Sequence, residues 1–178
     1  MSKQYITYNQ IHKLCAESAN KILSSDFTPD VILAIGGGGY IPARILRTFL
    51  KVPIKSVSLE LYDDITDKMG DSVLIKQWCS NDDIEGKNVL IVDEVDDTRS
   101  TLYTCVEKVL ESKPKKVGAF VLYNKLKNKH KGNHWDNEKA EKDHVNVDHY
   151  LVGAEVDDVW LVYPWEALDI DEHNSKAQ

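Results

Sequence analysis

The feature that most constrains the fold is a short apolar run that ends in consecutive glycines. VILAI (31–35) is unbroken and rich in β-branched residues, as expected of a strand that is buried on both faces. Four glycines, Gly36–Gly39, follow it, and Pro42 then opens the apolar stretch ARILRTFL. A strand, a glycine turn and a helix in this order are typical of a βα unit. The segment therefore predicts a parallel sheet with helices packed on it.

Apolar runs and amphipathic stretches alternate along the rest of the chain. Thr7 and Gln10 have the spacing of a capping box, which predicts an amphipathic helix through Ile22. Another helix is expected from Leu102 to Leu110. The remaining expected strands cover residues 56–62, 73–78, 89–92, 117–123, 150–154 and 159–165. The alternation predicts an α/β fold, a mainly parallel twisted sheet with flanking helices on both faces.

The length and the charge pattern also predict how the chain is divided. At 178 residues it is expected to form one domain over residues 1–178. Residues 124–149 are charged and poor in apolar groups, so we expect a variable excursion there. We expect the tail after Asp169 to fray, as chain ends usually do.

Composition excludes several classes of partner. The net charge of −7 is opposite in sign to that of proteins that neutralise nucleic-acid phosphates, so no nucleic-acid partner is expected. No apolar run approaches the roughly 18 residues of a membrane span, and the start lacks the features of a signal peptide. Cys15, Cys79 and Cys105 lie far apart and are expected to stay reduced. We therefore expect a soluble, cytoplasmic protein without a membrane partner.

The run VLIVDEVDDTRSTL (89–102) has the clearest chemical pattern. Four apolar residues place Asp93 and Glu94 at the carboxyl end of a buried strand, where open parallel sheets bind their ligands. Carboxylates there suit the hydroxyls of a sugar, or a magnesium ion held mostly by substrate phosphates.

A helix begins directly after this acidic stretch. Its first N–H groups lack intrahelical partners, and together with the hydroxyls of Thr98, Ser100 and Thr101 they form a nest for a phosphate. The same arrangement also occurs as an ordinary helix cap. With the acids upstream, however, the pattern describes a site for a phosphorylated ribose.

Other phosphate-binding motifs do not fit the sequence. Val95 occupies the third position of the D-x-D motif that aspartyl-nucleophile phosphatases need. No G-K-[ST] occurs, and Ile41 prevents the glycines from completing G-x-G-x-x-G. A receiver domain would carry its acidic strand end near the start of the chain.

The run 89–102 resembles the phosphoribosyl-diphosphate signature of type I phosphoribosyltransferases. Four further blocks resemble those of the 6-oxopurine branch in the same order: GGGGYIPARILRTFL, SLELYDD, FVLYNK and VWLVYPWE. The chain is similar in particular to short fungal-type hypoxanthine-guanine phosphoribosyltransferases. The resemblance implies the type I phosphoribosyltransferase fold, a sheet with flanking helices and a small hood.

The resemblance assigns roles around the phosphoribosyl group. Asp93 and Glu94 would hold the ribose hydroxyls directly or through Mg²⁺, with Glu166 as a further candidate metal ligand. Asp97 would be the catalytic acid–base residue beside N7 of the purine. The residues implied in phosphoribosyl and phosphate binding are Asp93, Glu94, Asp96, Asp97, Thr98, Arg99, Ser100 and Thr101. Gly36, Gly37 and Gly38 would bind the diphosphate through backbone N–H groups, in a turn that often contains a cis peptide bond in this family.

One position departs from the common signature, and another block supplies the base site. Arg99 stands where most of the family has glycine, so its side chain either points away from the phosphate or adds its own charge to it. Trp160 matches the aromatic residue that stacks on the purine, and Leu161 would offer backbone groups to the ring edge. Lys125 is the candidate donor to the 6-oxo group.

The resemblance implies a purine salvage enzyme that makes IMP or GMP and releases diphosphate. Its substrates would be 5-phosphoribosyl-1-diphosphate and a 6-oxopurine base, hypoxanthine or guanine, with Mg²⁺ as cofactor and a nucleoside monophosphate as product. A homodimer is expected. The alternatives are a xanthine-preferring enzyme, a transferase that acts on another base, and a non-catalytic regulator that senses phosphoribosyl diphosphate. The regulator would need a basic face, which the charge of −7 disfavours.

Overall fold

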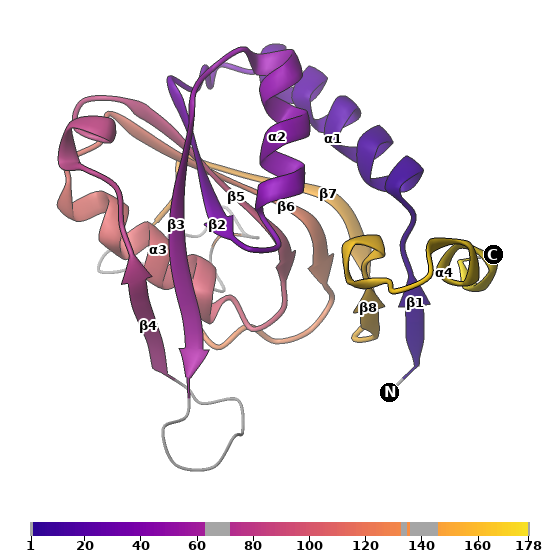
Figure 1. Ribbon diagram of the computed structural model, residues 1–178. Helices are drawn as coiled ribbons and strands as arrows, with labels where there is room; N and C mark the ends of the chain where they lie inside the picture. Colours follow the sequence, from indigo (N-terminus) through magenta and orange to yellow (C-terminus); the bar gives the residue numbers. More distant parts are fainter. Residues whose placement is uncertain (1, 63–71, 133–134, 136–145, 178) are drawn as a thin grey trace.

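The computed structural model describes residues 2–62, 72–132, 135 and 146–177. Its main sheet has the strand order β4-β3-β2-β5-β6-β7, and all neighbours are parallel except β3 and β4. The strands are β2 (Val31–Gly36), β3 (Ile54–Tyr62), β4 (Ser72–Gln77), β5 (Asn88–Asp96), β6 (Lys116–Lys125) and β7 (His149–Val156). Figure 1 shows the twisted sheet and the helices around it.

The helices cover both faces of this sheet. The helices on it are α1 (Tyr8–Leu23), α2 (Tyr40–Leu50) and α3 (Ser100–Glu111), whereas α4 (Ile170–Lys176) packs beside the strand Lys3–Tyr5. Short 3₁₀ turns lie at η1 (Asn81–Asp83) and η3 (Pro164–Glu166). Thr7 caps α1 in a reciprocal capping box with Gln10, as its spacing predicts. In the described part of the chain, no helix is long and apolar enough to cross a membrane.

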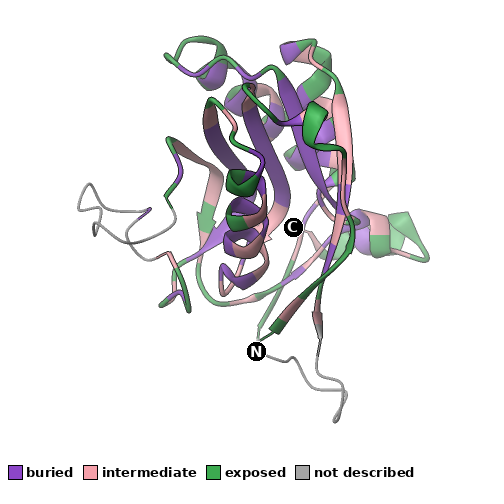
Figure 2. Cartoon of the chain, turned by 90° about the vertical axis from the view of Figure 1, so that its left-hand side faces the viewer, coloured by how far each residue is buried: buried purple, intermediate pink, exposed green. Residues whose placement is uncertain are grey.

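Two apolar cores lie on opposite faces of the sheet. On one face α1 and α2 pack against side chains such as Ile32, Leu90 and Phe120. On the other face α3 packs against the alternate residues of the same strands, including Leu33 and Ile91. Figure 2 shows the central strands buried between the helices. The strands read as unbroken apolar runs because both of their faces are covered.

A second, two-stranded sheet lies beside the main one. In it β8 (Trp160–Val162) pairs in parallel with β1 (Lys3–Tyr5), a strand that the sequence analysis does not predict. The chain ends therefore meet here, and in Figure 1 the C-terminal helix α4 lies next to β1.

The expectation of a frayed tail after Asp169 is wrong. Asp169 caps α4 by accepting hydrogen bonds from the N–H groups of Asp171 and Glu172. The His173 side chain is buried, and its Nε2 lies 2.7 Å from the carbonyl oxygen of Ile6. The tail is ordered because it docks on the segment that follows β1.

Candidate active site

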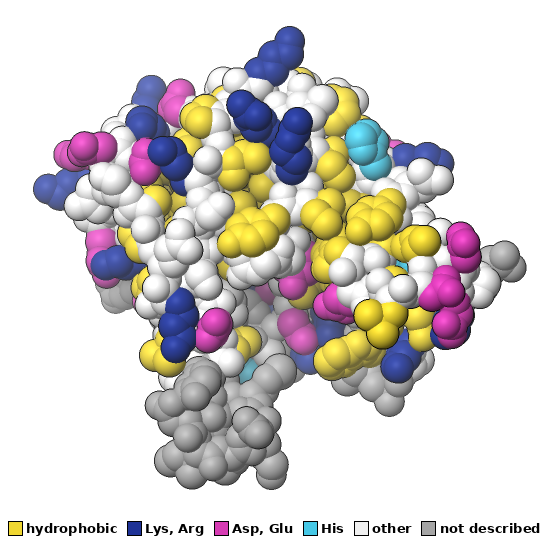
Figure 3. Space-filling model, in the orientation of Figure 1, with side chains coloured by type: hydrophobic (Ala, Val, Ile, Leu, Met, Phe, Trp, Pro, Cys, Tyr) yellow, Lys and Arg dark blue, Asp and Glu magenta, His cyan; other side chains and the backbone are white. Residues whose placement is uncertain are grey.

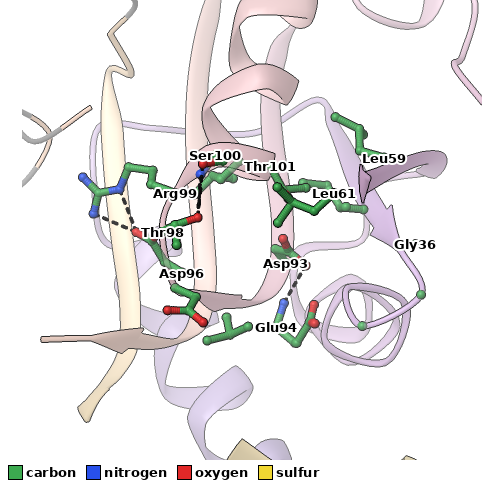
Figure 4. A pocket seen from close by; sticks show the side chains of 16 residues that line it. Gly36, Leu59, Leu61, Asp93, Glu94, Asp96, Thr98, Arg99, Ser100 and Thr101 are labelled. Atoms are coloured by element: carbon green, nitrogen blue, oxygen red, sulfur yellow. Dashed lines mark hydrogen bonds and ion pairs between the residues drawn. The ribbon is translucent and has the colours of Figure 1, made fainter. Parts of the chain in front are cut away.

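A cavity of about 260 Å³ lies at the carboxyl ends of β2 and β5. Its lining joins the glycine turn, two leucines of β3, and the acidic run with the start of α3. Figure 4 shows these side chains around the cavity. The lining residues are Ile35, Gly36, Gly37, Gly38, Leu59, Leu61 and residues 93–102. The sequence-predicted diphosphate turn and phosphoribosyl segment therefore meet at one site.

The glycine turn is shaped by what lies against it. A Cβ on Gly36 would lie 2.1 Å from the Tyr40 hydroxyl, and one on Gly38 would lie 2.0 Å from the Glu94 carboxyl carbon. At Gly39 a Cβ would meet backbone, 2.4 Å from the carbonyl oxygen of Val92. The peptide bond between Gly36 and Gly37 is cis. The glycines let the turn run close to the acidic end of β5.

Asp93 and Glu94 line the cavity, and no basic side chain of the described residues forms an ion pair with either of them. The Glu94 N–H donates to Oδ1 of Asp93 over 2.9 Å. Burial raises the pKa of the Asp93 carboxyl, and the neighbouring Glu94 charge raises it further. A cation at this place would favour the charged form of both acids.

These two acids fit Mg²⁺ in the way that substrate-bound Mg²⁺ is usually held, by one or two carboxylates and by phosphates. Within the described residues, no group of three or more His, Cys, Asp or Glu side chains is placed to hold a metal ion. Glu166, the third candidate ligand, is exposed in η3 and is absent from the cavity lining. The role of Glu166 as a third metal ligand stays a prediction, since it lies in η3 outside the cavity lining that contains Asp93 and Glu94.

The residues of the predicted phosphate nest lie at the start of α3. Thr98 Oγ1 lies 3.1 Å from the Ser100 hydroxyl, and both residues line the cavity with Thr101. Arg99 adopts a left-handed conformation with φ of 66° and makes no side-chain cap. The Ser100 N–H donates to Thr98 Oγ1 over a long 3.4 Å, and the Arg99 side chain caps none of the first N–H groups of α3, the kind of group that binds anions at helix starts.

The Arg99 side chain is buried beside Asp96. Its Nε and Nη2 lie 2.8 and 2.7 Å from Oδ2 of Asp96, and both side chains are fully buried. The guanidinium also donates to the Gly132 carbonyl oxygen and lies over the rings of Trp135 and Tyr150.

In Figure 4 Arg99 is directed to Asp96, away from Asp93 and Glu94. Of the two possibilities for Arg99, the side chain therefore points away from the phosphate nest. Asp96 and Arg99 both line the cavity, but their side chains pair with each other, so their predicted place in the phosphoribosyl site would depend on backbone groups.

Two lysines hold Asp97: Lys125, the last residue of β6, and Lys127, which follows the strand. Lys125 Nζ lies 3.0 Å from its Oδ2, and Lys127 Nζ lies 3.0 Å from its Oδ1. Burial raises the pKa of Asp97, but hydrogen bonds from Lys127 and Lys125 outweigh it, so the net shift is downward. The structure thus brings the predicted catalytic acid and the predicted purine-binding lysine into direct contact.

The candidate base site lies along β8. Trp160 is 58% exposed, and Leu161 is buried. The Trp160 N–H donates to the Ser2 carbonyl oxygen, and the Val162 carbonyl oxygen accepts from Ile6. Because backbone groups alternate along a strand, the N–H and C=O of Leu161 point to the other edge of β8. That edge is unpaired by any strand in the described part of the chain, which leaves it open to a ligand.

β8 is also tied to the acidic run. The Tyr163 hydroxyl donates to the Glu94 carbonyl oxygen over 3.0 Å, and Asp158, just before β8, lies 3.7 Å from Lys125. Acidic and basic side chains lie next to one another between the main sheet and the unit of β1, β8 and α4 (Figure 3). Of the base-site candidates, Lys125 contacts Asp97, whereas Trp160 and Leu161 do not line the cavity.

Sequence reasoning missed three charged residues around Asp97. They are Lys127, Asp158 and Lys129. The buried Lys129 donates to the carbonyl oxygens of Asp96, Asp97 and Lys125. The three lysines at 125, 127 and 129 were a visible signal in the sequence, although the strand ends at Lys125 and the chain bends at residues 126 and 127.

Comparison with known proteins identifies the family. A model of the phosphoribosyl transferase domain matches residues 3–157. The chain belongs to the phosphoribosyltransferase family. A hypoxanthine-guanine phosphoribosyltransferase of Schizosaccharomyces pombe is 43% identical, and the match covers 96% of this chain and 92% of that protein. Xanthine phosphoribosyltransferase 1 of Saccharomyces cerevisiae is 40% identical over 99% of this chain and 95% of its own.

A solved structure agrees with this assignment. A protein from Neisseria gonorrhoeae with bound ppGpp has a TM-score of 0.83 and 40% identity, covering 99% of this chain and 96% of that chain. The expected type I phosphoribosyltransferase fold is confirmed, with its parallel sheet and flanking helices. As a phosphoribosyltransferase with full-length relatives of the hypoxanthine-guanine type, the chain is an enzyme of this family.

Proposed function

We propose that the chain is a purine salvage phosphoribosyltransferase that makes IMP or GMP from hypoxanthine or guanine. The reaction breaks the bond from C1′ of phosphoribosyl diphosphate to its diphosphate oxygen and forms the bond from C1′ to N9 of the purine. One observation carries the proposal. Asp97 lines the cavity together with the glycine turn, Asp93 and Glu94, and it pairs with Lys125, so the proposed phosphoribosyl and base sites would adjoin at one edge of the sheet.

The phosphoribosyl half of the site is supported by its hydroxyls and open N–H groups. Thr98, Ser100 and Thr101 would cradle the 5′-phosphate at the start of α3. The N–H groups of the glycine turn would hold the diphosphate, since no Cβ keeps the backbone from the ligand. Asp93 and Glu94 would hold Mg²⁺, which supplies charge stabilisation for the leaving diphosphate when bound.

The base half of the site is supported by the contacts of Asp97. Its carboxylate is charged in the free enzyme because the lysines hold it so, and it would accept or share the proton at N7 of the purine. Lys125 would turn from Asp97 to the 6-oxo oxygen, while Trp160 stacks on the ring. Holding the base in line with C1′ lowers the barrier by several kcal/mol through orientation.

Hypoxanthine, guanine and xanthine share a 6-oxo group, which separates all three from adenine. A lysine near the 6-oxo group separates these bases from adenine, which carries an amino group there. Identity to the hypoxanthine-guanine and xanthine relatives is similar, at 43% and 40%. ppGpp, which the Neisseria gonorrhoeae protein binds, is a guanine nucleotide, and this favours guanine among the accepted bases.

The test is nucleotide formation from phosphoribosyl diphosphate and Mg²⁺ with hypoxanthine, guanine, xanthine and adenine in parallel. We expect turnover of hypoxanthine and guanine with adenine inert. Faster turnover of xanthine than of both other bases would establish the xanthine-preferring alternative. Tight binding of phosphoribosyl diphosphate without product from any base would contradict the proposal and favour the regulator.

We also propose that the enzyme works as a cytoplasmic homodimer, as its resemblance to the 6-oxopurine branch implies. Light scattering of the purified chain should give twice the mass of 20.2 kDa. A monomer at the concentrations of the activity assay would contradict the dimer.

A further inference from the structure

Four charged side chains form a compact cluster: Asp97, Lys125, Lys127 and Asp158. Of these, Asp97 also lines the cavity, and the other three lie outside its lining. Lys127 Nζ lies 3.0 Å from Asp97 and 3.0 Å from Oδ2 of Asp158, so it bridges the two acids. Lys125 Nζ lies 3.0 Å from Asp97 but 3.7 Å from Asp158. Both oxygens of Asp97 are therefore engaged, each by a different lysine.

The two lysines differ in what they are able to do. The Lys125 side chain is 7% exposed, whereas that of Lys127 is 27% exposed. If Lys125 turns to the 6-oxo group of a bound purine, it leaves Asp97. Lys127 has a second acid, Asp158, that fixes it in place while Lys125 moves.

We propose that Lys127 is a positioning residue that keeps the Asp97 carboxylate charged and oriented once Lys125 has turned to the base, and that Asp158 holds Lys127 in place. This inference rests on the proposed function, because it needs a purine that draws Lys125 away. Asp158 also immediately precedes the segment Val159–Trp160, so the bridge connects the acid to the strand that carries the stacking tryptophan.

The charges around Asp97 decide the direction of the effect. In the described part of the chain, the charged groups against Asp97 are Lys125 and Lys127 at its carboxylate, Lys129 at its carbonyl oxygen, and Asp158 behind the lysines. Loss of Lys127 leaves a partly buried carboxylate without a cation after Lys125 turns, and burial then favours the protonated form. Loss of Asp158 acts in the opposite sense, because it removes a negative charge that shares Lys127.

The first experiment is the pH profile of kcat with hypoxanthine for Lys127→Gln, which reports the enzyme–substrate complex. We expect its acid limb to move up by roughly 0.5–1 pH unit, with KM for phosphoribosyl diphosphate nearly unchanged. Lys127→Arg should restore most of the profile. The matched control is Lys115→Gln, which removes the same charge from an exposed site before the opposite end of β6 and should leave the profile unchanged.

The second variant, Asp158→Asn, separates electrostatics from structural damage. We expect its acid limb to move down or stay in place, whereas general damage would move both variants the same way. Carbon NMR of the Asp97 carboxyl, assigned with Asp97→Asn, gives the titration of the free protein without any turnover. A higher midpoint in Lys127→Gln than in the wild type supports the bridge.

The outcomes also separate this inference from the proposed function. An inactive wild type with every base contradicts the proposed function. An active wild type with identical kcat profiles and identical Asp97 titration in Lys127→Gln overturns the positioning role alone. A shift of the same sign and size in Lys127→Gln and Asp158→Asn would overturn it as well.

Discussion

Two acidic pairs lie within one short segment, and the structure treats them differently. Asp93 and Glu94 face the cavity, and no ion pair with a basic side chain reaches them among the described residues. Asp96 and Asp97 each bind cations of the protein, Asp96 through Arg99 and Asp97 through two lysines. In the sequence each pair consists of two adjacent acids, so the sequence does not show which pair binds basic side chains.

The difference shows how one loop divides its charges between ligand and fold. Acids left without a cation in a cavity are suited to a cation or sugar hydroxyls that arrive with the substrate. The fully buried Asp96–Arg99 ion pair stabilises the loop between β5 and α3. Asp97 is held by Lys125, the candidate base-binding lysine.

The largest effect is expected for Asp97→Asn. An amide is unable to take the purine proton, so kcat with hypoxanthine should fall by about 10²- to 10⁴-fold. The thermal unfolding midpoint should change little, because Asp97 is one of the partly exposed acids of the site. Steady-state kinetics and a thermal unfolding curve check both points. A loss of folding stability as large, in free energy, as the loss of turnover would contradict the assigned role.

A similar free energy, but in stability rather than turnover, is expected for Arg99→Met. This change leaves Asp96 buried and without its guanidinium partner, which costs about 3–5 kcal/mol of the free energy of unfolding. Urea unfolding measures the loss. The double variant Asp96→Asn/Arg99→Met should lose less than the sum of the two single changes. Strict additivity would show that the two side chains do not act as a pair.

A smaller effect is expected for Gly38→Ala. The new Cβ would meet the flexible end of Glu94, so the fold should survive while the carboxylate is displaced from the cavity. We expect kcat/KM for phosphoribosyl diphosphate to fall by roughly 10- to 100-fold. Gly39→Ala is the contrasting variant, because its Cβ meets backbone and should lower the unfolding midpoint instead. Unchanged kinetics in Gly38→Ala would contradict the place given to Glu94.

The sequence predicts the parts of this site that are local. The run 89–102 contains a buried strand, its acids and the hydroxyls of the next helix in one stretch, so pattern and chemistry agree. The glycine turn is equally local. Family resemblance then points to Lys125 and Trp160, which short-range patterns alone leave ambiguous.

The rest depends on contacts between segments distant in sequence. Lys127, just past β6, pairs with Asp97, and Asp158, just past β7, pairs with Lys127; no periodicity in the sequence indicates these contacts. Arg99 has the same appearance in the sequence whether it faces phosphate or Asp96, and only the position of Tyr150 and Gly132 decides it. The order of the tail depends in the same way on the carbonyl of Ile6.

The central claim is that Asp93 and Glu94 bind phosphoribosyl diphosphate, whereas Asp97 acts on the base. Calorimetric binding of phosphoribosyl diphosphate with Mg²⁺ tests it most directly. The proteins compared are the wild type, Asp97→Asn, and the double variant Asp93→Asn/Glu94→Gln. The account predicts a wild-type Kd for Asp97→Asn and a Kd weakened by more than about tenfold for the double variant. Equal weakening in both variants, or none in the double variant, would contradict it.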